Sequence, residues 1–211
     1  MNHALIGEIA GVLAVVQVIP YIVSIFHGHT KPERATYFIW LIVDAVTITS
    51  YIAVGARTTI WTGLVFTVSA LLIFILSIRY GMGGFSKFDI ICLLLALGGI
   101  SIWITTGDAL LTLYFSTFVT LIGYLPTIKK VYFLPETENT LSWAMCSGAS
   151  VLNILALTTL RPSIALLPIS SAIMEVLIAY LLLFPAARAK VRRHRQPHPV
   201  HAFLTHPIFA K

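Results

Sequence analysis

Long apolar runs are the feature that most limits what this chain can fold into. Seven stretches of about 20 residues are rich in Leu, Ile, Val and Phe, and short polar breaks separate them. A helix needs about 20 apolar residues to cross the hydrocarbon core of a bilayer. The chain is 58% hydrophobic and 10% charged, whereas soluble domains carry about 25% charged residues. The sequence therefore predicts an all-α integral membrane protein.

The positions of the polar breaks define the expected helices. The seven expected spans are residues 5–26, 36–55, 60–78, 88–106, 109–128, 141–160 and 164–184. The short connections at 55–59 and 106–108 predict antiparallel hairpins. A basic tail over residues 185–211 follows the last span. We expect this tail to be disordered and its first part to rest on anionic lipid headgroups.

Two distant segments share one pattern of a proline, a basic loop and a hydroxyl–aromatic pair. Pro20 lies in the first run and Thr36-Tyr37 opens the second, while Pro126 lies in the fifth run and Ser142-Trp143 opens the sixth at the same distance. Such a repeat predicts two triple-helix units. The expected units are residues 5–78 and 109–184, and 88–106 is the linker helix between them. A single linking span leaves the two units parallel in the membrane.

This 3+1+3 arrangement resembles the PQ-loop/SWEET (MtN3) superfamily over residues about 5–185. The Pro-Gln pair of that family is replaced here by Pro20-Tyr21 and Pro126-Thr127. The resemblance implies a transporter of a small polar solute, such as a sugar or an amino acid, that works by alternating access. Relatives with this fold include a peptide-binding cargo receptor. A receptor or scaffold that binds a peptide or partner without transport is therefore the alternative, and a non-transporting assembly partner stays open.

Lys and Arg are divided unevenly between the two expected sides of the membrane. The loops on the side of the N-terminus carry only Arg57 and Arg161, and the other 12 of the 14 lie in the remaining loops and the tail. The positive-inside rule then places the N-terminus outside and the C-terminus in the cytoplasm. We expect the protein in the plasma membrane, and the net charge of +6 to act on anionic headgroups rather than on nucleic acid.

Polar residues inside the expected spans are the candidates for a central site. An ionised carboxylate in a bilayer costs about 2.5–3.5 kcal/mol on insertion scales. Asp44 and Glu175 should therefore face a cavity or a partner, or be protonated. No Lys or Arg falls mid-span to pair with them, which favours a protonatable carboxyl or a cationic ligand. The alternative is that these residues only lock helix packing. The candidate substrate-binding residues are Asp44, Asn153, Glu175, Ser69 and Ser150, and the further cavity candidates are Gln17, Thr47, Tyr51 and Tyr124.

The register of the repeat relates these candidates to one another. It pairs Asp44 with Ser150, Thr47 with Asn153, and Ser69 with Glu175. Paired polar positions on facing helices are typical of a site between two repeats. Two substrate classes remain open, namely proton-coupled transport of an amino acid or another cationic metabolite, and facilitative flux of a sugar.

Pro20 and Pro126 lack a backbone N–H and should kink their helices. We expect them to act as hinges of the cytoplasmic gate, and static kinks are the alternative. Aromatic residues near the same ends of the spans are expected to form an interface belt. The aromatic residues assigned to this belt are Tyr21, Tyr37, Trp40, Trp143, Tyr132 and Tyr80.

The residue pattern does not support metal binding, phosphate binding or catalysis. Cys92 and Cys146 lie in apolar runs, as small buried residues do, and they are too few and too far apart for a metal knuckle. No phosphate-binding loop and no nucleophile–base set is present, so we expect neither an enzyme nor a cofactor or metal. A homo-oligomer is compatible with the sequence.

Overall fold

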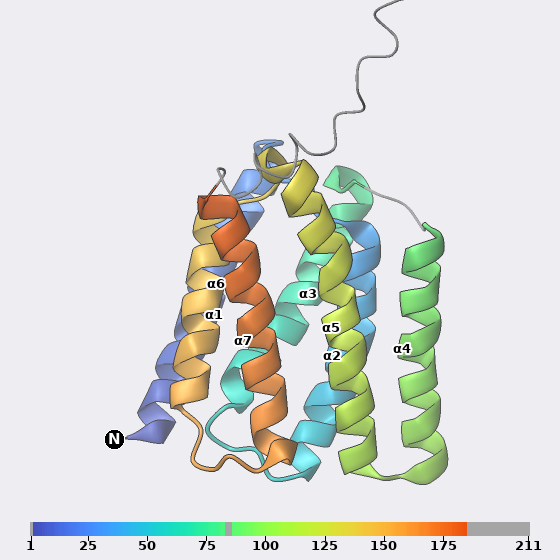
Figure 1. Ribbon diagram of the computed structural model, residues 1–211. Helices are drawn as coiled ribbons and strands as arrows, with labels where there is room; N and C mark the ends of the chain where they lie inside the picture. The colour runs from blue at the N-terminus through green and yellow to red at the C-terminus, as the bar shows by residue number, and fades with distance from the viewer. Residues whose placement is uncertain (1, 83–85, 185–211) are drawn as a thin grey trace, which may run out of the picture.

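The described part of the chain is a bundle of α-helices. The computed structural model describes residues 2–82 and 86–184, so the expected disordered tail at 185–211 lies outside the described residues. Figure 1 shows the helices standing side by side, with α4 at the edge of the bundle. The α-helices are α1 His3–Phe26, α2 Arg34–Ala53, α3 Ile60–Tyr80, α4 Lys87–Thr106, α5 Ala109–Phe133, α6 Thr140–Leu155 and α7 Pro162–Leu183, and Pro135–Thr137 forms a 3-10 turn, η1.

The helices have the composition of a membrane bundle. Among the described residues, five helices are long and apolar enough to cross a membrane, namely α1, α2, α3, α5 and α7. Helix α6 is shorter, with 16 residues. Large apolar side chains point outward, for example Val12 (63% exposed) and Ile173 (61%), whereas Glu175 is 1% exposed. This distribution is the reverse of a soluble domain, and it supports the prediction of an integral membrane protein of helical type.

Two expected helix ends differ from the structure by five residues each. The fifth run was expected to end at residue 128, but α5 continues to Phe133, so Lys130 belongs to the helix. The sixth was expected to reach residue 160, but α6 ends at Leu155. Asn139 caps the start of α6, because its side chain accepts a hydrogen bond from the Ser142 amide at 2.8 Å, as N-cap residues do.

Successive helices run in opposite directions, so the connections gather at two ends of the bundle (Figure 1). The N-terminus lies at one end with the connections 54–59, 107–108 and 156–161, and we call this the amino-terminal end. The connections 27–33 and 134–139 lie at the other end with the last turn of α7, and we call this the basic-loop end. Each end therefore contains segments from both halves of the chain.

The inter-helix packing connects the two halves of the chain. Helix α1 packs on α3 and α6, and α2 packs on α3 and α5. Helix α7 packs on α5 and α6, while α4 touches only the neighbouring α2 and α5 among the major contacts of the described residues. The six helices other than α4 thus surround a common centre, and α4 covers one side.

Small residues bring α1 close to the chain around it. Gly7, Ala10, Gly11 and Ala14 form one buried face of α1. A Cβ on Gly7 would overlap the backbone oxygen of Thr58, and one on Gly11 would lie 2.8 Å from the Cβ of Trp61. Small residues spaced four apart are the usual means of close helix packing in membranes, where hydrophobic burial drives association only weakly.

Replacing Gly7 with Ala should destabilise the protein, because the added Cβ has no room beside the Thr58 backbone. Overpacking of this kind typically costs about 1–3 kcal/mol. Thermal unfolding of the purified protein in detergent should give a lower Tm for Gly7→Ala. The matched control is Gly98→Ala, whose Cβ would lie at an ordinary 3.6 Å from the Phe115 ring. Equal Tm values for the two variants would contradict this packing.

Candidate functional site

A cavity of about 110 Å³ lies among the six helices that surround the centre of the bundle. Since a buried water needs about 10–15 Å³ of such space, the cavity has room for several waters or a small solute. All nine candidate substrate and cavity residues line it, on α1, α2, α3, α5, α6 and α7. These residues are Gln17, Asp44, Thr47, Tyr51, Ser69, Tyr124, Ser150, Asn153 and Glu175. The structure therefore brings them together, and their roles in binding stay predictions.

Glu175 on α7 is the most deeply buried carboxyl group at the cavity. Its side chain accepts hydrogen bonds from the Tyr124 hydroxyl at 2.8 Å and from the Ser150 hydroxyl. The thiol of Cys146 is a third hydrogen-bonding neighbour. These donors come from α5 and α6, so Glu175 joins three helices at the cavity wall. Hydrogen bonds to a carboxylate stabilise its charged form and fix its orientation.

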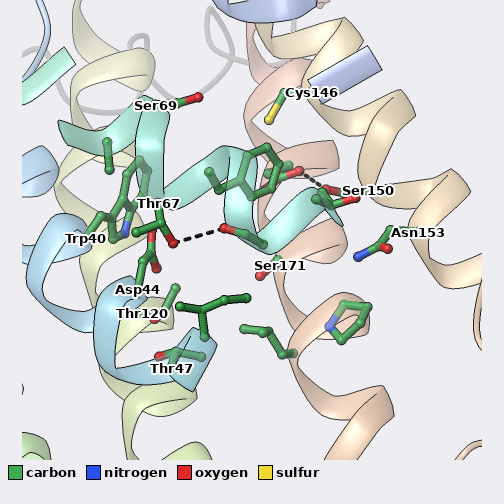
Figure 2. Close-up of a pocket in the computed structure, with 18 of the residues that line it drawn as sticks. Trp40, Asp44, Thr47, Thr67, Ser69, Thr120, Cys146, Ser150, Asn153 and Ser171 are labelled. Atoms are coloured by element: carbon green, nitrogen blue, oxygen red, sulfur yellow. Dashed lines mark hydrogen bonds between the residues drawn. The ribbon is translucent and has the colours of Figure 1, made fainter. Parts of the chain in front are cut away.

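Asp44 on α2 is the second carboxyl group that lines the cavity (Figure 2). It interacts electrostatically with Glu175. No Lys, Arg or His is found among the described residues that line the cavity. A buried carboxylate without a cationic partner is costly. The two acidic groups therefore give this cavity the chemistry of a cation or proton site.

Each half of the chain carries one carboxyl residue and one serine at related positions, but the positions of the two are swapped between the halves. In the expected register, Asp44 on α2 corresponds to Ser150 on α6, and Ser69 on α3 corresponds to Glu175 on α7. Ser150 donates to Glu175, but the Ser69 hydroxyl donates to the Val65 carbonyl oxygen at 2.7 Å in its own helix. The carboxyl group of the first half is thus left without the hydroxyl donor that its counterpart has.

Four aromatic residues assigned to an interface belt line the cavity instead. Tyr21, Tyr37, Trp40 and Trp143 are between 3% and 9% exposed, and all four line the cavity. The rings of Tyr21, Tyr37 and Trp40 follow one another, with centroids 6.1 Å and 5.4 Å apart. Tyr124 continues this aromatic wall, with its ring centroid 4.7 Å from that of Trp40. The belt prediction for them was wrong because position near a span end does not reveal which face of the helix carries the ring.

Several polar atoms of the cavity residues have no hydrogen-bond partner in the described part of the chain. They are Trp40 Nε1, Thr62 Oγ1, Thr120 Oγ1, Ser142 Oγ and Asn153 Oδ1. Buried polar groups in proteins nearly always have a partner, either in the protein or in an ordered water. Because these atoms belong to residues around one cavity, they indicate a site whose hydrogen bonds are completed by water or by a polar ligand.

The proposed hinges lie outside the cavity wall. Pro20 and Pro126 occur inside α1 and α5, and neither lines the cavity. The Pro20 carbonyl oxygen accepts a 3.4 Å hydrogen bond from Asn139 at the basic-loop end. Pro168, inside α7, does line the cavity. Their part in any movement stays a prediction.

The prediction from the sequence did not include a buried ion pair at the basic-loop end. Lys130 Nζ lies 2.5 Å from Glu138 Oε1, and their side chains are 6% and 1% exposed. The expected end of the fifth span at residue 128 places both residues in the following connection. The available signal was the helical period, because Lys130 follows Gly123 by seven residues and Thr127 by three, and continuation of the helix places all three on the same buried face of α5.

Comparison of the chain with protein-family models, with curated proteins and with solved structures finds no significant match. The site therefore rests on the residues and their geometry alone.

Replacing Ser150 with Ala removes one donor from the buried Glu175 carboxyl group. Leaving a buried acceptor without its partner should cost about 1–3 kcal/mol, seen as a lower Tm in detergent. Ser69→Ala is the control, because Ser69 lines the same cavity but bonds only within its own helix. A decrease in Tm for Ser69→Ala as large as that for Ser150→Ala would show that the lost contact with Glu175 does not cause the destabilisation.

Proposed function

We propose that this protein transports a small polar solute across a membrane by alternating access. The observation that carries this proposal is one central cavity lined by two carboxyl groups, an aromatic wall and unpartnered polar atoms. Such a combination of apolar lining and a few convergent polar groups is typical of a ligand site. Transporters built from repeats hold their substrate near the bilayer midplane, between the repeats.

The 3+1+3 division into two parallel triple-helix repeats is part of the proposal. Its support is that the contacts of one half recur in the other. The contacts α1–α3 and α2–α3 match α5–α7 and α6–α7, and α1–α6 matches α5–α2. We assign α4 as the linker and propose that all seven α-helices cross the membrane, in an architecture that resembles the PQ-loop/SWEET superfamily.

The repeated hydroxyl–aromatic pairs supply a second argument for the repeat. The rings of Tyr37 and Trp143 both line the cavity. The preceding hydroxyls, on Thr36 and Ser142, are both buried without a hydrogen-bond partner in the described residues. Equivalent positions in the two halves thus share their surroundings, as expected for helices related by an axis along the membrane normal.

Among polar solutes, a cationic one fits this cavity best. Asp44 and Glu175 supply negative charge without a cationic side chain in the described lining. Trp40 and Tyr124 add ring faces, which attract cations by about 0.5–2 kcal/mol. A proton could take the place of the solute on either carboxyl group, which provides a means of proton coupling. The favoured solute is therefore an amino acid or another metabolite with a positive charge, and a sugar is the second choice.

The competing function is a receptor or scaffold that binds a peptide without transport. A receptor for a peptide carboxylate needs cationic groups to hold it. The described lining offers none, so transport of a cation is favoured over this alternative.

Uptake into proteoliposomes should depend on both carboxyl groups. We expect radiolabelled lysine or choline to be taken up, and Glu175→Gln or Asp44→Asn to lower the uptake rate at least ten-fold, because each removes charge from a poorly solvated site. A ten-fold loss corresponds to about 1.4 kcal/mol. Glucose serves as the neutral comparison solute in the same assay.

Glu8→Gln is the control for the loss of a negative charge, since Glu8 is exposed and does not line the cavity. Uptake unaffected by Glu175→Gln and Asp44→Asn would contradict the site. Saturable binding of a peptide without flux of any solute would favour the receptor.

The proposed orientation puts the basic-loop end and the C-terminus in the cytoplasm of the cell, with the protein in the plasma membrane. In a background with Cys92→Ser and Cys146→Ser, a cysteine added after Lys211 should resist an impermeant thiol reagent in intact cells. A cysteine inserted after Met1 should react. The opposite pattern of labelling would reverse the orientation.

A further inference from the structure

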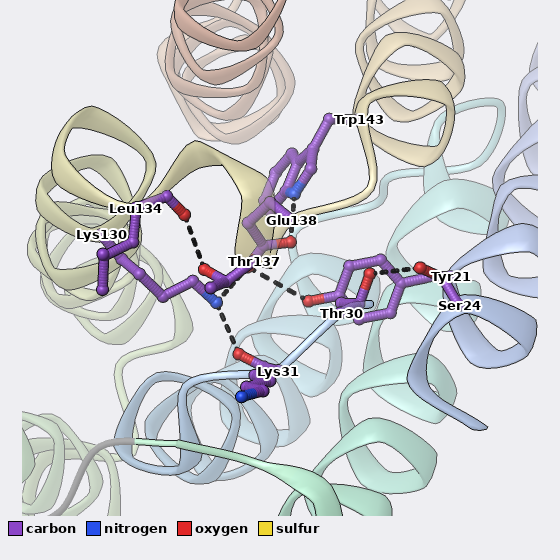
Figure 3. A network of polar contacts seen from close by, with 9 residues as sticks. All are labelled: Tyr21, Ser24, Thr30, Lys31, Lys130, Leu134, Thr137, Glu138 and Trp143. Atoms are coloured by element: carbon purple, nitrogen blue, oxygen red, sulfur yellow. Dashed lines mark hydrogen bonds and ion pairs between the residues drawn. The ribbon is translucent and has the colours of Figure 1, made fainter. Parts of the chain in front are cut away.

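A network of polar contacts lies at the basic-loop end of the bundle (Figure 3). At its centre is the Glu138 carboxylate, with Lys130 Nζ 2.5 Å from Oε1. The Trp143 indole donates to Oε2 at 2.9 Å, and the Tyr21 hydroxyl donates to Oε1 at 3.4 Å. Lys130 also donates to the Lys31 carbonyl oxygen at 2.7 Å. Both charges therefore have several partners, as a stable buried ion pair requires.

The network lies directly against the cavity. Tyr21 and Trp143 bind Glu138 through their polar atoms, and both also line the cavity. Their rings therefore separate the cavity from the ion pair. A movement that releases either ring from Glu138 would change the cavity wall at this end.

The contacts of Glu138 divide into two groups. Lys130 on α5 and Trp143 on α6 belong to the same triple-helix unit as Glu138, whereas Tyr21 on α1 belongs to the other unit. The contacts within the unit are an ion pair and a 2.9 Å hydrogen bond. The contact across the units is a longer hydrogen bond, at 3.4 Å. Breaking a buried ion pair is far more costly than breaking one hydrogen bond, so separation of the units would occur between Tyr21 and Glu138.

The other polar contacts that cross the units at this end, among the described residues, are also hydrogen bonds. Besides the bond from Lys130 to Lys31, the Lys31 amide donates to the Thr137 carbonyl oxygen at 3.1 Å, and Asn139 donates to the Pro20 carbonyl oxygen at 3.4 Å. Each can be exchanged for a bond to water when the loops separate. The ion pair can then keep its geometry on one side of the opening.

We infer that Lys130 and Glu138 form the fixed half of a latch, and that release of the Tyr21 hydroxyl from Glu138 opens the cavity toward the basic-loop end. This inference rests on the two-unit transporter proposed above. Glu138 is a positioning residue, which holds Tyr21 and Trp143 in the cavity wall when the latch is closed. Lys130 keeps the Glu138 carboxylate in place whether the latch is closed or open.

The amino-terminal end is closed by contacts between neutral groups. The Tyr51 hydroxyl lies 2.6 Å from Thr59 Oγ1 and donates to the Ile164 carbonyl oxygen at 2.8 Å, which joins α2 to α7. Tyr51 also lines the cavity. Tyr51→Phe therefore removes a tyrosine hydroxyl that crosses the units at the opposite end, and it is the natural comparison for Tyr21→Phe.

Side-specific labelling of Cys146 tests the latch. Cys146 lines the cavity, and Cys92→Ser leaves it as the single thiol, since the chain has two cysteines. The probe is a sulfonatoethyl methanethiosulfonate, applied to sealed vesicles of either orientation. Its negative charge keeps it from crossing the membrane and distinguishes it from the proposed cationic solutes. Tyr21→Phe should raise the rate of Cys146 labelling about three- to ten-fold from the basic-loop side. The rate from the amino-terminal side should stay unchanged.

Two variants serve as controls. Tyr51→Phe should raise labelling from the amino-terminal side only. Ser24→Ala removes a 2.6 Å hydrogen bond to Thr30 at the basic-loop end, within one unit, and should change neither rate. Unchanged labelling for Tyr21→Phe, or an equal rise from both sides, would overturn the latch. Labelling requires no solute, so its outcome is separate from that of the uptake assay. The latch can be contradicted while uptake is observed, and it can be supported where no solute is transported.

Discussion

Polar groups inside a lipid-facing bundle must find their partners within the protein, and this constraint governs how the helices are arranged. Glu175 satisfies it by joining α7 to α5 and α6 through Tyr124 and Ser150. Glu138 satisfies it through Lys130, Trp143 and Tyr21. Each carboxyl group is thus a point where several helices are held at fixed distances. Many large apolar residues face outward, and there they contribute little to which helices meet.

The three carboxyl groups that are buried or line the cavity in the described part of the chain differ in their partners, and this difference separates structure from function. Glu138 has a cationic partner, Glu175 has neutral donors, and Asp44 faces the cavity beside a second negative group. A carboxylate that is paired within the protein supports the fold, whereas one that is not paired attracts a proton or a cation. The same physical rule therefore accounts for the closed end of the bundle and for the proposed substrate preference.

Much of the candidate site could be predicted from the sequence because lipid makes intramembrane polar residues conspicuous. Asp44, Asn153 and Glu175 are predicted on this ground and from the register of the repeat, and all three line one cavity. The aromatic wall could not be predicted. Trp40 occurs near a span end, where rings in lipid and rings in a cavity have the same sequence context. Gly123 decides between them, because a Cβ there would lie 2.7 Å from Trp40 Nε1 and leave the indole no room beside α5.

The sequence by itself determined the class of protein, the approximate helices and the uneven division of charge, because these depend on local composition and on the thickness of a bilayer. Only the tertiary structure decided what each charge does. Lys130 was counted as a cytoplasmic loop residue, yet it lies on α5 and pairs with Glu138. Arg34 was counted in the same way, yet it donates to the Ser77 and Gly81 carbonyl oxygens at the end of α3. Such pairings join residues far apart in the chain, and composition contains no information on which surfaces meet.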